Sequence, residues 1–252
     1  MEPDPKEVEQ LIRDKYHGDR SVDITEDLAR LRAGEPLDYV IGWKPFLGLK
    51  ICLDSKPLIP RPETEWWTEL MVADLAERFG DSPFTFLDMC AGSGAIGLAV
   101  LKACPQAQVT FSELVPAHAE LIRINLMLAE NRLDVSRAEV RVGDLFDPVE
   151  ERRFDIVAAN PPYIPEGREL DASVADHEPH EALYAGTDGL TLIRKIAAEA
   201  PRHIHAGGSL WMECDTDNVH EAAYLLREEG AIRTDVRTDL YGRDRVVLAW
   251  YP

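Results

Sequence analysis

The sequence lacks any run of about 18 or more apolar residues, so no transmembrane helix and no membrane partner are predicted. The residues from Met1 to Lys6 are polar and acidic, and they contain no apolar stretch of the kind found in signal peptides. Cysteine is scarce, with 4 among 252 residues, and without a C-x-x-C pair neither a zinc site nor a disulfide framework is indicated. These absences favour a protein of the reducing cytoplasm without a bound metal.

Positive charge is scarce too, because 27 Lys and Arg residues face 46 Asp and Glu residues, a formal net charge of −19. So acidic a chain repels a phosphate backbone, and no local cluster of Lys and Arg offsets that repulsion. We therefore expect no stable binding to nucleic acid, whereas a basic protein or a small cationic ligand is easier to accommodate. Hydrophobic (45%) and charged (29%) residues are balanced as in globular proteins, which excludes a disordered or low-complexity chain.

Apolar periodicity divides the chain into a head, a linker and a large α/β body. Residues 5–16 and 24–33 are predicted to be short polar helices, and residues 36–60, punctuated by Gly and Pro, a β-hairpin. The expected boundaries are a short helical head over 1–35, a hairpin linker over 36–60 and one domain over 61–252. In that domain, helices are expected over 64–79, 95–104, 116–131, 188–204 and 216–229, and strands over 84–88, 107–112, 138–142, 154–159, 208–213, 231–238 and 243–250. This alternation predicts a parallel sheet with helices on both faces and ligands outside the carboxyl ends of the strands.

A glycine-rich turn follows the first strand of the predicted body, in the segment from Asp88 to Gly94 (D-M-C-A-G-S-G). Its glycines permit positive φ and close approach of the backbone to a ligand. The string G-x-G-x-x-G formally matches a dinucleotide fingerprint, so a nicotinamide or flavin enzyme is an alternative. Against it, the turn has no Lys or Arg to neutralise phosphate, and Asp88 is placed to pair with a cationic amino acid moiety.

An acidic residue also follows each of the next two predicted strands. Glu113 at the tip of the second strand suits a bidentate hydrogen bond to two ribose hydroxyls. Asp144 after the third strand suits an adenine amino group, with Leu145 or Phe146 against the ring. Three acidic loops in succession indicate a nucleoside that bears a positive centre and no phosphate, as in S-adenosylmethionine.

The most specific motif is Asn160-Pro161-Pro162-Tyr163, directly after the fourth strand. The two prolines fix φ and remove two backbone donors, which lets the Pro161 carbonyl point into a pocket. Together with the Asn160 side-chain carbonyl, it can accept both protons of one –NH₂ group and direct the nitrogen lone pair at a methyl donor. Tyr163 supplies a ring face that favours the developing cation. The motif therefore predicts N-methylation by positioning and electrostatics.

The chain resembles the HemK/PrmC-type protein-(glutamine-N5) methyltransferases over roughly residues 34–250. The resemblance rests on the two motifs above and on four further segments: Gly34 to Gly42 with Phe46, Leu58 to Glu65, Glu178 to Leu190, and Asp239 to Val247. This family modifies the Gly-Gly-Gln glutamine of peptide-chain release factors. The resemblance implies the same methylation activity in this chain. It also implies S-adenosylmethionine as methyl donor, S-adenosylhomocysteine as product and a release factor as partner. It also implies a class I, Rossmann-like sheet of seven strands with an antiparallel last strand; we expect a monomer.

The resemblance assigns site residues. The catalytic residues would be Asn160, Pro161 and Tyr163; the substrate would also contact Pro162, Arg61, Glu63, Thr64 and Glu178. The cofactor would be held by Asp88, Cys90, Ala91, Gly92, Gly94, Glu113, Leu114, Asp144, Leu145, Phe146 and Asn160.

Three departures from the family's pattern bear on these assignments. Cys90 stands where the family usually has the first glycine of its cofactor turn, and it would narrow the methionine pocket. Glu113 stands where Asp is common, and the head is much shorter than the family's helical domain. The alternatives left open are an N6-adenine or guanine-N2 nucleic-acid methyltransferase, a non-catalytic cofactor-binding adaptor and the dinucleotide oxidoreductase.

Overall fold

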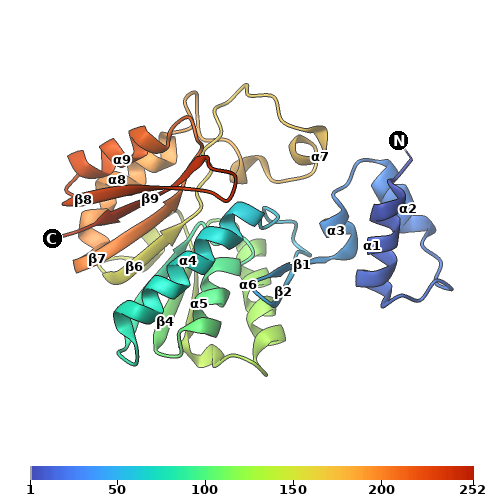
Figure 1. Ribbon diagram of the computed structural model, residues 1–252, viewed down its shortest axis with the longest axis horizontal. Helices are drawn as coiled ribbons and strands as arrows, with labels where there is room; N and C mark the ends of the chain where they lie inside the picture. The colour runs from blue at the N-terminus through green and yellow to red at the C-terminus, as the bar shows by residue number, and fades with distance from the viewer. Residues whose placement is uncertain (1) are drawn as a thin grey trace.

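A seven-stranded sheet forms the centre of the protein in the computed structural model, which describes residues 2–252 (Figure 1). The spatial order of its strands is β5-β4-β3-β6-β7-β9-β8. Their bounds are β3 (Phe84–Met89), β4 (Ala107–Glu113), β5 (Ala138–Val142), β6 (Phe154–Ala159), β7 (Ile204–Glu213), β8 (Arg233–Thr238) and β9 (Asp244–Trp250). The first five in that order pair in parallel, whereas β9 is antiparallel to both β7 and β8. The predicted sheet with an antiparallel last strand is thus confirmed.

Helices cover both faces of the sheet because its strands are apolar on both sides. Along β6, Ile156 and Ala158 join one hydrophobic cluster while Val157 and Ala159 join the other, as the two-residue period of a strand requires. The first cluster packs against α4 (Pro62–Phe79), α5 (Ala95–Ala103) and α6 (Pro116–Ala129). The second packs against α8 (Thr191–His203) and α9 (Val219–Glu228). Within residues 2–252, no helix has the length and apolarity needed to cross a bilayer.

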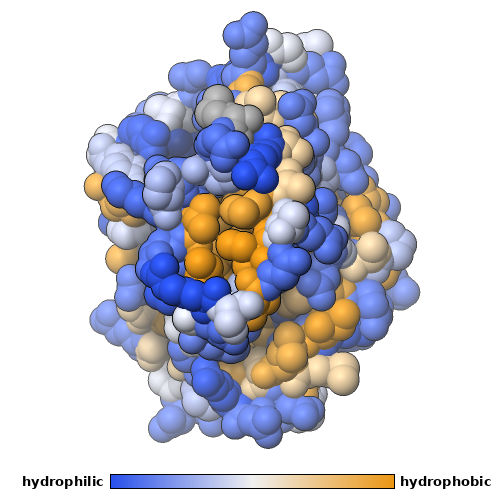
Figure 2. Space-filling view, turned by 90° about the vertical axis from the view of Figure 1, so that its right-hand side faces the viewer, coloured by the Kyte–Doolittle hydropathy of each residue, from blue (hydrophilic) through white to orange (hydrophobic). Residues whose placement is uncertain are grey.

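The N-terminal segment packs as a small unit beside this body (Figure 1). It comprises α1 (Pro5–Tyr16), α2 (Thr25–Arg32) and α3 (Leu37–Ile41). The hairpin of β1 (Trp43–Phe46) and β2 (Leu49–Cys52) follows, and its buried residues Phe46, Leu49 and Ile51 belong to the first hydrophobic cluster of the body. A separate hydrophobic cluster of Leu11, Leu31, Val40 and Ile41 holds the helices together. Seen end-on, this face gathers hydrophobic residues at its centre within a hydrophilic surround (Figure 2). Within residues 2–42, Val22 is the one large hydrophobic residue that is exposed.

The structure differs from the sequence prediction at the start of the linker. Residues 36–60 were predicted as a hairpin alone, whereas Leu37–Ile41 form the helix α3 before the hairpin begins. Pro36 precedes the helix, and Gly42 ends it with a φ of 90°. The Tyr39 hydroxyl donates a hydrogen bond of 2.6 Å to the carbonyl of Pro57, which closes the linker on itself.

A long connection between β6 and α8 lies above the carboxyl ends of the central strands. It carries the short helix α7 (Ala172–Ala175) and the 3₁₀ turn η3 (His180–Ala182). Its two limbs are tied by the bridge between Ile164 and Tyr184. Two further 3₁₀ turns, η1 (Val135–Arg137) and η2 (Asp147–Val149), flank β5. The connection therefore covers the edge of the sheet where the predicted motifs lie.

Candidate active site

An open cleft with about 650 Å³ of empty space lies at the carboxyl ends of the parallel strands. Its lining comes from the loops after β3, β4, β5 and β6, as the topology of a parallel sheet predicts. The lining residues are Leu58, Cys90, Gly92, Ser112, Glu113, Leu114, Val115, His118, Gly143, Asp144, Leu145, Asn160, Pro162, Glu181, Ala182 and Leu192. None of these lining residues is Lys or Arg, while three carry carboxylates. We call this the cofactor cleft; its charge fits a cationic ligand without phosphate.

The turn after β3 has the left-handed backbone that its glycines permit. Gly92 and Gly94 have φ values of 55° and 79°, and Cys90 has a φ of 57°. Cys90 therefore adopts a conformation that glycine favours, which is the residue its position has in the family. Cys90 and Gly92 line the cofactor cleft, whereas Ala91 and Gly94 do not line it.

Asp88 lies beneath this turn, completely buried, and does not line the cleft. Its Oδ2 accepts a hydrogen bond of 2.8 Å from the backbone N–H of Gly97 in the first turns of α5. Its Oδ1 has no hydrogen-bond partner within residues 2–252. Burial raises the pKa of Asp88 to about 8, although the Gly97 donor opposes that rise. Asp88 thus braces the turn and offers one unsatisfied oxygen beneath it.

Glu113 joins the first two loops of the cofactor cleft. Its Oε2 accepts from the N–H of Gly92 at 2.7 Å, and its Oε1 accepts from the N–H of Val115 at 2.8 Å. A carboxylate has about four acceptor positions, so each oxygen retains one for a ligand. The acid predicted to bind ribose is therefore fixed in place by the backbone on both sides.

The loop after β5 divides its predicted residues between the cleft and the core. Asp144 lines the cleft and forms an ion pair of 3.3 Å with Lys195. Leu145 also lines it, and its carbonyl accepts a hydrogen bond from Ser112 Oγ. Phe146 is buried instead, with its ring stacked on His203 at 4.4 Å between centroids. Leu145 rather than Phe146 is thus available to a ligand.

A second cleft, with about 410 Å³ of empty space, adjoins the first and is called the acceptor cleft below. It is lined by Leu58, Arg61, Asn160, Pro161, Tyr163, Ile164, Val174, Ala182 and Leu183. Leu58, Asn160 and Ala182 line both clefts, so Asn160 stands where the two meet. Pro161 and Tyr163 face the acceptor cleft, and Pro162 faces the cofactor cleft.

Asn160 is held from behind by α4. Its Nδ2 donates a hydrogen bond of 3.3 Å to Thr64 Oγ1, in the first turn of that helix. No residue of the described chain 2–252 donates to its Oδ1, which is therefore free to accept. The backbone after it is held as well, because Asn218 Nδ2 donates to the carbonyl of Tyr163 at 3.2 Å.

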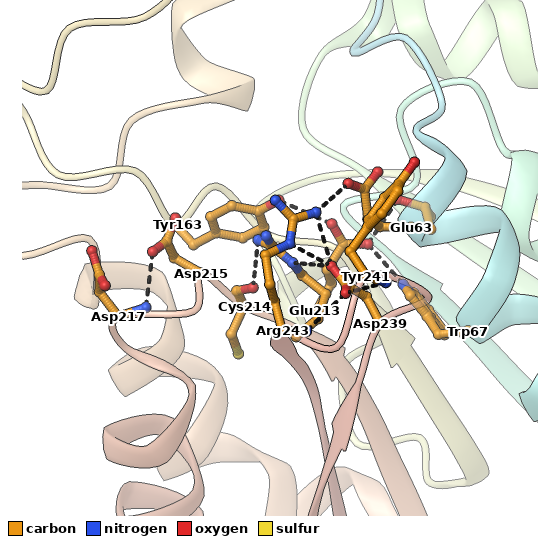
Figure 3. Close-up of polar contacts among 12 residues, drawn as sticks. Glu63, Trp67, Tyr163, Glu213, Cys214, Asp215, Asp217, Asp239, Tyr241 and Arg243 are labelled. Carbon is orange, nitrogen blue, oxygen red and sulfur yellow. Dashed lines mark hydrogen bonds and ion pairs between the residues drawn. The ribbon is translucent and has the colours of Figure 1, made fainter.

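A buried carboxylate that sequence reasoning missed lies behind both motif side chains. Glu213, the last residue of β7, accepts hydrogen bonds from Thr64 Oγ1 at 2.7 Å and from Tyr163 Oη at 2.9 Å. It also accepts from Trp67 Nε1 at 2.7 Å, and the close-up shows it between Trp67 and Tyr163 (Figure 3). Burial raises the pKa of Glu213, while the three donors and Arg245 oppose the rise. The only sequence signal was an acid that ends an apolar strand.

The other residues assigned to the substrate do not all face the acceptor cleft. Arg61 lines the acceptor cleft and donates from Nη2 to Glu178 Oε1 at 2.5 Å. Glu178 is buried, also accepts from the N–H of Ile59 at 3.1 Å and lines neither cleft. Glu63 lies away from both clefts and pairs with Arg243 at 2.8 Å (Figure 3). Glu178 thus shapes the wall of the acceptor cleft through Arg61.

Comparisons with known proteins show the family and the fold of this chain. The family model of the methyltransferase small domain matches residues 67–229. A release factor glutamine methyltransferase from Mycolicibacterium smegmatis is 39% identical over 227 residues, which cover 89% of this chain and 78% of that protein. Another, from Deinococcus radiodurans, is 37% identical over 228 residues, covering 89% of this chain and 77% of that protein. The crystal structure of a methyltransferase from Pyrococcus furiosus, 17% identical, has a TM-score of 0.58 and covers 90% of this chain and 98% of that one. That last likeness shows a shared fold.

Proposed function

We propose, since this chain belongs to the release factor glutamine methyltransferase family, that it methylates the side-chain amide nitrogen of a glutamine in a peptide-chain release factor. The acceptor is the glutamine of the Gly-Gly-Gln motif. The observation that carries the proposal is the position of Asn160 on both clefts, with its Oδ1 free and its Nδ2 engaged behind. An amide acceptor at that junction can be reached from the cofactor cleft.

S-adenosylmethionine supplies the methyl group, as an electrophilic substituent of its sulfonium. The cofactor cleft fits this molecule because Glu113 offers acceptor positions for ribose hydroxyls and Asp144 offers one for an amino group. Cys90 and Gly92, from the turn that follows Asp88, also line this cleft. The absence of Lys and Arg from the lining residues disfavours the phosphates of a dinucleotide.

Catalysis by this chain consists of orienting a poor nucleophile. Asn160 Oδ1 and the Pro161 carbonyl accept the two protons of the glutamine amide, which directs the nitrogen lone pair toward the cofactor cleft. The Tyr163 ring borders the acceptor cleft and stabilises positive charge that develops on the nitrogen. Its hydroxyl is held by Glu213, so the ring is fixed before the substrate binds. The nitrogen loses its proton after the transfer, and no side chain with a tuned pKa is required.

We further propose that the protein acts as a monomer in the reducing cytoplasm, without stable binding to nucleic acid. The net charge of −19 and the four free cysteines support these proposals.

The test is tandem mass spectrometry of a purified release factor after incubation with the protein and S-adenosylmethionine. We expect one added methyl group on the Gly-Gly-Gln glutamine. Asn160→Ala should reduce the rate at least about 100-fold, because a positioned polar group is lost, while cofactor affinity measured by calorimetry changes little. Asn131→Ala, an exposed position away from both clefts, is the matched control. An unmodified glutamine with cofactor binding intact would contradict the proposed acceptor, and full activity of Asn160→Ala would contradict the role of its side chain.

A further inference from the structure

Three hydrogen-bond donors converge on one buried carboxylate behind the acceptor cleft. Glu213 is 1% exposed, and it accepts from Thr64, Trp67 and Tyr163 at distances of 2.7, 2.7 and 2.9 Å. Thr64 is 4% exposed and lines neither cleft, so its hydroxyl cannot touch a ligand from where it lies. Yet that hydroxyl is the partner of Asn160. These hydrogen bonds therefore connect Glu213 to Thr64 and Thr64 to Asn160.

The donor and the acceptor in each of these hydrogen bonds are fixed by the protons that each group carries. A threonine hydroxyl has one proton, and Glu213 Oε2 acts as the acceptor here, since it also receives the Trp67 N–H, which can only donate. The Thr64 proton is committed to Glu213 Oε2, so toward Asn160 the Thr64 oxygen can only accept. The amide of Asn160 must then turn its Nδ2 toward Thr64. The reverse orientation would place two oxygen acceptors face to face in a buried setting, which is costly.

We infer that Thr64 and Glu213 are positioning residues that set the polarity of the Asn160 amide, so that its oxygen and not its nitrogen faces the acceptor. The inference rests on the proposed function in one respect: if the methyl group goes to a glutamine –NH₂, that group needs an oxygen of Asn160 to accept its hydrogen bond. If the Asn160 amide were flipped, its –NH₂ would face the –NH₂ of the substrate. The substrate amide would then lose one of the two oxygens that accept its hydrogen bonds.

Trp67 also fixes which atom of residue 213 accepts the hydrogen bond from Thr64. Its indole N–H only donates, and it shares Oε2 with Thr64. In Glu213→Gln, the amide oxygen is therefore kept at the position of Oε2, and the amide nitrogen takes the place of Oε1 opposite Tyr163. The Tyr163 hydroxyl can accept that bond, since a phenol both donates and accepts. Glu213→Gln should thus preserve the orientation of Asn160, although it removes the charge.

Substitutions of Thr64 separate polarity from packing. Thr64→Ser retains the hydroxyl but loses a methyl group, whereas Thr64→Val retains the shape but loses the hydroxyl. If Thr64 only filled the core, valine would be the better replacement. If Thr64 sets polarity, serine is the better one. We expect Thr64→Ser to keep most of the activity and Thr64→Val to lower kcat about tenfold, the scale of one lost hydrogen bond. Cofactor affinity should be equal in both.

A readout independent of activity is the side-chain amide of Asn160 in ¹⁵N-labelled protein, assigned by its loss in Asn160→Ala. We expect one amide proton with the shift and slow exchange of a hydrogen-bonded group in the wild type, Thr64→Ser and Glu213→Gln, and its loss in Thr64→Val. An unchanged signal in Thr64→Val, or valine more active than serine, would overturn the inference. A wild type that leaves the release factor unmodified would instead overturn the proposed function, and the amide signal would still decide the inference.

Discussion

At the scale of single residues, Asp88 shows that an acid of the glycine-rich motif can lie outside the cleft that the motif lines. The carboxyl group lies under the turn after β3, with one oxygen bonded to the Gly97 N–H and the other without a partner in the described chain 2–252. Any ligand group that reaches that oxygen gains a buried hydrogen bond. Asp88 thus ties β3 to α5, the two elements on either side of the turn.

The raised pKa of Asp88, about 8, predicts a pH dependence of stability. The folded protein retains the Asp88 proton up to about pH 8, whereas the unfolded chain releases it near pH 4. The stabilisation is therefore complete below pH 4 and is lost as pH rises to 8. Relative to Asp88→Asn, the wild type should lose about 4 kcal/mol, or about 10 °C in Tm, between pH 5 and pH 8, because each pH unit costs about 1.4 kcal/mol.

Thermal unfolding of both proteins across this pH range is the measurement. Asp81→Asn, an exposed position, controls for removal of an acidic residue in general. A constant difference in Tm between wild type and Asp88→Asn would show that Asp88 does not titrate there.

At the scale of elements, the turn before α8 fits closely against the segment that carries the catalytic motif. Gly189 has a φ of 73°, and a Cβ at this position would overlap the carbonyl oxygen of Tyr163. Gly189→Ala should therefore displace Tyr163 and lower the transfer rate about 100-fold, the usual cost of a shift of about 1 Å in a reacting group. Gly167→Ala is the matched control, because Gly167 has a φ of 84° but open space around it. Equal activity of the two variants would refute the close fit; steady-state kinetics decide.

The ion pair between the partly exposed Arg61 and the buried Glu178 joins the residue before α4 to the connection above the sheet. Glu178→Gln keeps an acceptor for one of its two donors, Ile59 N–H or Arg61, but removes the charge opposite the guanidinium. We expect Arg61 to leave the wall of the acceptor cleft, so that KM for the release factor rises about tenfold while kcat changes less.

Glu169→Gln, in an exposed part of the same connection, is the control for that experiment. Kinetics with the release factor as the varied substrate give the KM. If KM rises equally in Glu169→Gln, the effect comes from surface charge and not from the ion pair of Arg61 and Glu178.

Sequence patterns predicted the elements of the body well because its strands and helices alternate over a continuous apolar background. They missed α3 because five helical residues among prolines and glycines have no resolvable period. The placement of Asn160 and Glu113 followed from the rule that strand ends meet at one edge. Glu213 could not be found in this way, because its bonds to Thr64 and Tyr163 join residues 149 and 50 positions apart. Likewise, only packing could show that Phe146 belongs to the core.

At the scale of the whole molecule, charge separates protein acceptors from nucleic-acid acceptors that use the same motif. With a net charge of −19 and no Lys or Arg among the residues that line the cofactor cleft, the described chain offers little attraction for phosphates. We expect no transfer of labelled methyl groups to adenine or guanine in RNA or duplex DNA at about 0.15 M salt. Lowering the salt tenfold is the control for weak association. Labelled nucleic acid at a rate comparable to that of the release factor would contradict this expectation.

The junction at Asn160 has a consequence for inhibitor design. Because Leu58, Asn160 and Ala182 line both clefts, a molecule that reaches from one cleft into the other would pass beside these residues. A cofactor analogue with a glutamine-like carboxamide tethered at the sulfonium position would bind its second half as an intramolecular event, at an effective concentration in the millimolar range. Such a bisubstrate compound would gain affinity from linkage alone, and it would select for enzymes whose two clefts share a wall.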